Sequence, residues 1–107
     1  MNLPTVVQSY IDASNAHDVP SILSCFAEDA VVRDENETMR GRIDIERWVT
    51  TTVEKYNFQF KPLSSQERDN ETVVGVEVSG TFPGSPICLD YHFAITSDKI
   101  ASLIIDS

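Results

Sequence analysis

The stretch FAEDAVVRD, residues 26–34, decides the fold that this sequence predicts. Phe26 closes an apolar helical pattern, and Asp29 marks the end of that helix. The last five residues of the stretch, which include two β-branched valines, are therefore predicted to form a strand. Val32 and Asp34 lie two positions apart and therefore share one face of that strand. Because a carboxylate on an apolar face is costly without a partner or a function, Asp34 is the first candidate for a functional residue.

Two interpretations of Asp34 follow from this position. In the functional interpretation it is a general base in an apolar cavity, with a pKa raised by desolvation. In the structural interpretation it is an acid at a strand end that is solvated or paired with Arg33 or Arg40.

Around this stretch the sequence places helices first and strands last. Helices are predicted from apolar side chains at spacings of three and four, over residues 4–14, 18–26 and 45–56. In the third helix, Trp48 is expected to be a buried anchor and not a ligand contact. Strands are predicted at residues 30–34, 38–40, 58–61, 72–82, 87–95 and 100–105.

This element order has no βαβ alternation and therefore predicts an α+β fold with an antiparallel sheet. Gly75 and Gly80 would allow the long strands to curve. Three helices closing the mouth of such a curved sheet would leave a conical interior.

Composition and charge predict one domain over residues 1–107 and limit its partners. The 17 acidic and 8 basic residues give a net charge of −9, which argues against nucleic acid or an anionic membrane as partner. No stretch resembles a signal peptide or a membrane span, and Cys25 and Cys88 are expected to be reduced, so the expected location is cytoplasmic. His17 and His92 are far apart and no ligand motif is present, so neither a metal nor a cofactor is predicted.

The order helix, helix, FAEDAVVRD, short hairpin, GRIDIERW helix and long meander resembles the NTF2-like superfamily, which includes the SnoaL-like proteins. The resemblance covers essentially the whole chain. It implies a cone-shaped α+β fold with an internal pocket, and dimerisation through the outer face of the sheet. It does not fix the function, because this fold hosts isomerases, cyclases, dehydratases, hydrolases and binding proteins.

VVQSYIDASNAHD followed by FAEDAVVRD is similar to the steroid Δ-isomerases of this superfamily. The similarity implies that Tyr10 and Asp34 face one pocket, with Asp34 as general base and Tyr10 as donor to an oxyanion. The third position of that family, an aspartic acid two residues before a phenylalanine, is occupied here by Tyr91 in the sequence DYHF. Asp90 comes one residue early and would face outward unless a β-bulge turned it in. Because a phenol can also donate to an oxyanion, Tyr91 is the third catalytic candidate.

The implied ligand is a small apolar molecule, such as a cyclic carbonyl compound. No cation is expected in the cavity, so the ligand is expected to carry neither phosphate nor carboxylate. The predicted function is an isomerase or cyclase of this kind, and the alternative is a non-catalytic binding or dimerisation module. The side chains expected to contact the ligand are Phe26, Val32, Phe58, Val76, Phe82 and Phe93.

The outer face of the sheet predicts a homodimer. The strands at 72–82 and 87–95 each present a second face with small or mixed side chains, among them Ser79 and Ala94. A small domain with an uncovered sheet face tends to bury it against a second copy. Light scattering at micromolar concentration should therefore return twice the chain mass of 11.9 kDa. A mass equal to that of one chain would contradict the prediction.

Overall fold

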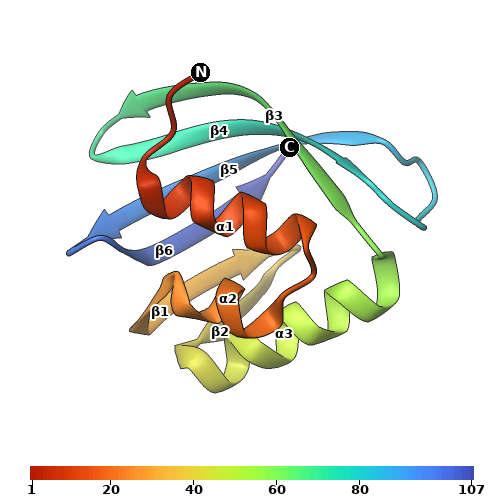
Figure 1. Cartoon of the computed structure of the whole chain (residues 1–107), viewed down its shortest axis with the longest axis horizontal. Coiled ribbons are helices and arrows are strands. Elements are labelled where there is room, and N and C mark those ends of the chain that lie inside the picture. Colours follow the sequence, from red (N-terminus) through yellow and green to blue (C-terminus); the bar gives the residue numbers. More distant parts are fainter.

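Three helices lie against the concave face of one six-stranded sheet (Figure 1). The computed structural model describes all residues, 1–107. The predicted α+β architecture is confirmed. In chain order the elements are α1 (Thr5–Asn15), α2 (Val19–Ser24), β1 (Phe26–Asp34), β2 (Glu37–Arg40), α3 (Gly41–Tyr56), β3 (Gln59–Arg68), β4 (Glu71–Ser79), β5 (Ile87–Thr96) and β6 (Lys99–Asp106).

Local sequence signals set the helix boundaries. Asp18 caps α2, because its carboxylate accepts hydrogen bonds from the backbone N–H of Ser21 at 3.3 Å and from the Ser21 hydroxyl at 2.7 Å. Helix α3 begins at Gly41, whose φ of 80° strains any side-chain-bearing residue, and it ends before Asn57 in the left-handed conformation. None of the three helices is long and apolar enough to cross a membrane.

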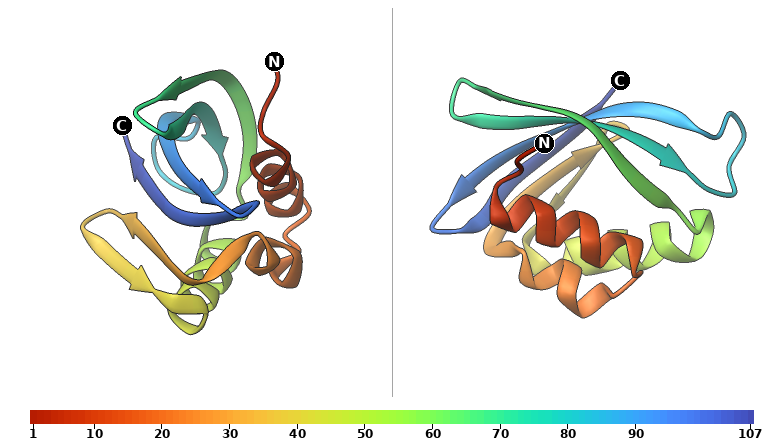
Figure 2. Two further views of the ribbon diagram at one scale, coloured as in Figure 1. Left: turned by 90° about the vertical axis from the view of Figure 1, so that its left-hand side faces the viewer. Right: turned by 45° about the horizontal axis from the view of Figure 1, so that its top comes forward.

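The sheet curves around the helices, with the strand order β2-β1-β6-β5-β4-β3 (Figure 2). Every neighbouring pair is antiparallel except β1 and β6, which run parallel. The sheet is therefore mixed and not wholly antiparallel as predicted, because the last strand returns to lie beside the first. This pairing sets Val32 opposite Leu103 and Asp34 opposite Ile105.

Three strand connections are two-residue turns with positive φ at both residues: Glu35–Asn36, Asp69–Asn70 and Ser97–Asp98. Positive φ at both positions is the mark of a type I′ turn, whose twist matches that of the flanking strands. The first of these turns fixes the end of β1, because Asp34 pairs with Glu37 directly across it. The position of the candidate base is thus set by a tight turn on one side and by β6 on the other.

Two strands, β1 and β3, extend several residues beyond their predicted bounds. β1 begins at Phe26, with a register shift between Phe26 and Val31 that lets the chain leave α2 directly into the sheet. β3 continues through Pro62 to Arg68, although the proline was expected to interrupt it. The proline is tolerated because β3 is an edge strand, and the pairing with β4 is irregular between Pro62 and Ser64.

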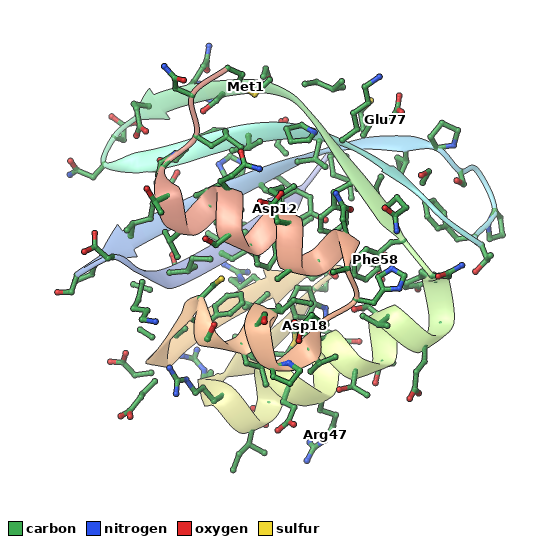
Figure 3. All side chains as sticks on the ribbon, in the orientation of Figure 1. Met1, Asp12, Asp18, Arg47, Phe58 and Glu77 are labelled. Carbon is green, nitrogen blue, oxygen red and sulfur yellow. The ribbon has the colours of Figure 1, made fainter.

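The outer face of the sheet, opposite the helices, is polar at its centre. Glu77 of β4 lies on this side (Figure 3). On β5, His92 lies between two carboxylates, with Nδ1 3.6 Å from Glu71 and Nε2 3.2 Å from Asp106. These are the two contacts within 4 Å between a carboxylate and a basic side chain, and both lie on the outer face of the sheet.

Candidate functional site

The concave side of the sheet and the three helices line a half-open cavity of about 460 Å³. Thirteen of its 19 lining residues are hydrophobic. Both the size and the mostly apolar lining with a few polar groups are typical of small-molecule sites. The interior is therefore a hollow with room for a ligand.

Five of the side chains predicted for the site line this cavity. They come from α1, the end of β1, β5, the α3–β3 connection and the β4–β5 loop, namely Tyr10, Asp34, Tyr91, Phe58 and Phe82. Phe58 lies beside the α1–α2 loop, with its ring centroid 5.2 Å from that of His17 (Figure 3). Residues more than 80 positions apart in sequence thus meet in one space.

Four of the predicted ligand contacts do not line the cavity: Phe26, Val32, Val76 and Phe93. All four are completely buried in the core. They point toward the concave face as predicted, but surrounding side chains bury them completely and leave no free surface. The expectation that they contact a ligand is therefore corrected.

The buried phenylalanines instead support the two tyrosines from behind. The Tyr10 ring lies 5.8 Å from Phe26 and 5.6 Å from Phe93, both edge-on. Phe93 also stacks on Tyr91 at 6.2 Å, and Phe60 contacts Tyr91 at 5.5 Å. Because aromatic contacts restrict the rotation of each ring, this cluster fixes the direction of both phenol groups.

Asp34 is half-buried at the edge of the cavity and has one direct partner. The indole N–H of Trp48 donates a hydrogen bond to Asp34 Oδ2 at 3.2 Å. Neither Arg33 nor Arg40 forms an ion pair with it, so the structural interpretation as an arginine-paired acid does not hold. Oδ2 is therefore held in place while the second carboxyl oxygen, Oδ1, has no side-chain partner.

Burial raises the pKa of Asp34 above its ordinary value of 3.8. The hydrogen bond from Trp48 lowers this pKa, whereas the neighbouring Glu35 and Glu37 raise it. Desolvation is the largest of these effects. A carboxyl with a raised pKa in an apolar cavity is typical of a general base.

Burial also raises the pKa of both tyrosines. For Tyr10 a hydrogen bond with Ser14 acts in the opposite direction, while Asp34 and Cys25 raise the pKa further. For Tyr91 the nearby Tyr10 and Asp34 add to the effect of burial. Both phenols therefore stay protonated at neutral pH, and each can donate a hydrogen bond into the cavity.

The register of β5 decides which residue of DYHF faces the cavity. Asp90 is exposed and lies opposite Gly75 of β4 and Asp106 of β6. The register shift of this strand lies between Ala94 and Ile95, too far away to turn Asp90 inward. Tyr91 is therefore the inward residue, and the third position of the isomerase pattern is a phenol here.

Two residues of α3 line the cavity against expectation. Trp48 was predicted to be a buried anchor, but it is half-buried and lines the cavity beside Asp34. Lys55, the last residue but one of α3, also lines the cavity and corrects the expectation that no cation is present. The apolar spacing of α3 predicted a core position for Trp48. Only the hydrogen bond of its indole to Asp34 shows that it belongs to the site. No group of three or more His, Cys, Asp or Glu side chains is placed to hold a metal ion.

The fold and the cavity together define a protein of the NTF2-like class. Residues 7–102 match the SnoaL-like domain, and the chain belongs to that family. No curated protein matches the sequence.

Several solved structures are similar over nearly the whole chain. A "putative polyketide cyclase" from Sinorhizobium meliloti is 38% identical with a TM-score of 0.93, covering 97% of this chain and 95% of its own. A ketosteroid isomerase-like fold protein from Catenulispora acidiphila, in complex with trimethylamine, is 18% identical with a TM-score of 0.86, covering 99% of this chain and 87% of its own. A "putative ketosteroid isomerase" from Kribbella flavida is 14% identical with a TM-score of 0.81, covering 95% and 74%. The last two likenesses show the fold alone.

Replacing the carboxyl of Asp34 with an amide should stabilise the protein at neutral pH. Since the pKa of Asp34 is raised on folding, the folded state binds its proton more tightly than the unfolded chain does. The corresponding stability is complete below pH 3.8 and is lost as the pH rises through the raised pKa. Asp34→Asn should therefore have a larger free energy of unfolding than the parent in urea at neutral pH, and an equal one in strong acid.

Asp90→Asn provides the matched control, because Asp90 is an exposed acid on the outer face. It should show no gain at either pH. An Asp34→Asn protein less stable than the parent at neutral pH would mean that favourable contacts hold the carboxylate.

Proposed function

We propose that this protein is an enzyme that removes a proton from a carbon next to a carbonyl group in a small apolar substrate. The proposal depends on one observation. Asp34, a half-buried carboxyl with a raised pKa and no cationic partner, lines the same apolar cavity as two protonated phenols. A base beside two neutral donors is what enolate chemistry requires.

Asp34 is the base in this reaction. The C–H bond next to the carbonyl breaks, its electron pair forms the carbon–carbon double bond of an enolate, and the carbonyl oxygen takes the negative charge. The proton is held on Asp34, whose Oδ2 is fixed by Trp48 so that Oδ1 faces the substrate. Because burial disfavours the charged carboxylate, protonation of Asp34 removes this desolvation penalty.

Tyr10 and Tyr91 stabilise the enolate. Each donates its O–H to the developing oxyanion, and their aromatic neighbours hold them in position before the substrate arrives. Preorganised donors in an apolar site stabilise such a charge more than water does, because they need no reorientation during the reaction.

Two products follow from one enolate. If Asp34 returns the proton to a different carbon, the result is an isomer. If the enolate carbon attacks a second carbonyl of the same molecule, a ring closes and the new alkoxide takes the proton from Asp34. The 38% identity to a protein described as a polyketide cyclase favours the second outcome.

The test follows proton exchange at the carbon next to a ketone, a step shared by both outcomes. The probe is 2-tetralone in D₂O, and NMR measures the loss of its α-proton signals. Asp34→Asn keeps the shape of the side chain and should lower the exchange rate by ~10²–10⁴-fold. Tyr10→Phe should lower it less, because Tyr91 remains as a donor.

Asp90→Asn, which removes an acid from the outer face, should leave the exchange rate unchanged. An Asp34→Asn protein that exchanges as fast as the parent would contradict the proposal. Binding of 2-tetralone without any exchange above the buffer rate would favour the non-catalytic binding module instead.

A further inference from the structure

A second hollow adjoins the apolar cavity on the far side of Asp34 and Trp48. It has a volume of about 430 Å³ and lies between α3 and the β1–β2 hairpin. Only three of its 12 lining residues are hydrophobic, in contrast to the first cavity. The two hollows share six residues, namely Asp34, Glu35, Trp48, Thr52, Lys55 and Tyr56.

The polar cleft has an ordered distribution of charge. Along α3, Arg47, Thr51 and Lys55 follow one another at a spacing of four and therefore share one face of the helix. The β1–β2 hairpin contributes the acids Asp34, Glu35 and Glu37, and the first turn of α3 contributes a fourth acid, Asp44. A single negative group would thus be attracted to the part of α3 that carries Arg47 and Lys55, and a group with several negative charges would be repelled by the acids of the cleft.

Lys55 is the only cationic residue that lines the apolar cavity, and it also lines the polar cleft. Its side chain is exposed and forms no salt bridge within the chain. Its ammonium lies 5.1 Å from the centroid of the Tyr56 ring, whose side chain lines both hollows. In a chain with 17 acidic and 8 basic residues, an unpaired cation where the two hollows meet is available to a ligand.

We propose that the ligand is amphipathic, with an apolar carbonyl-bearing part in the cavity and one anionic group, such as a carboxylate, at Lys55. The nature of the apolar part rests on the function proposed above, whereas the anionic group rests on Lys55 alone. Thr52 of α3 also lines both hollows, and its hydroxyl donates a hydrogen bond to the Val49 carbonyl at 2.9 Å. The chain thus selects for one negative charge and against a diphosphate or a dicarboxylate.

Two fluorescent probes that differ by one charged group test this proposal. N-phenyl-1-naphthylamine is neutral, and 8-anilinonaphthalene-1-sulfonate is the same ring system with one sulfonate. Lys55→Met removes the charge and keeps the length of the side chain. It should weaken binding of the sulfonate probe by about fivefold and leave the neutral probe unchanged. Added salt should likewise weaken only the sulfonate probe with the parent protein.

Two further variants make the result specific. Lys61→Met removes an exposed lysine of β3 that lines neither hollow, and it should change neither affinity. Leu89→Trp fills the cavity from β5 and should displace both probes, which identifies the cavity as their site.

Equal affinities of parent and Lys55→Met for the sulfonate probe would overturn the anionic group and leave the proposed proton transfer intact. Equal weakening of both probes by Lys55→Met would also overturn it, because Lys55 would then act through packing. Failure of the parent to bind either probe would contradict a ligand cavity and with it the proposed function.

Discussion

The hydrogen bond from the Trp48 indole to Asp34 is the interaction on which the candidate site depends. It joins the end of β1 to the middle of α3, so the candidate base in the apolar cavity is oriented by a helix packed across the sheet. The bond opposes the desolvation that raises the pKa of Asp34, and it leaves one carboxyl oxygen free. A carboxyl without this donor would be costlier to ionise, and one with an arginine partner would be too stable as an anion to act as a base.

The rest of the fold keeps that interaction in register. The two-residue turn at Glu35–Asn36 ends β1 directly after Asp34, and the parallel pairing with β6 holds the strand from the other side. Phe26 and Phe93 lie behind Tyr10 and keep its phenol directed into the cavity. These completely buried core residues do not line the cavity themselves. They set the positions of the groups that a substrate would meet.

The sequence was sufficient for the architecture because its periodicities change clearly from helical to extended. The helix spacing of residues 45–56 and the alternation of residues 87–95 each depend on local patterns that tertiary packing reinforces. The pairing of the strands was harder to predict from the sequence. The parallel β1–β6 pair joins distant parts of the chain, and the continuation of β3 through Pro62 depends on its being an edge strand.

The site could be predicted only in part, because local patterns are readable from the sequence and long-range contacts are not. Alternation places Asp34 and Tyr91 on the concave face, but it cannot tell a residue at the cavity surface from one buried beneath other side chains. Phe26, Val32, Val76 and Phe93 were misplaced for that reason. Trp48 and Lys55 were missed because their roles come from distances between α3 and β1 that no local pattern encodes.

The most direct measurement is an NMR titration of the Asp34 carboxyl carbon in the parent protein and in Trp48→Phe. The account predicts that the pKa of Asp34 in the parent lies above 3.8, and that it rises further when the indole donor is removed. A pKa at or below 3.8 in the parent, or one that does not change in Trp48→Phe, would contradict the assignment of Asp34 as a desolvated base held by Trp48.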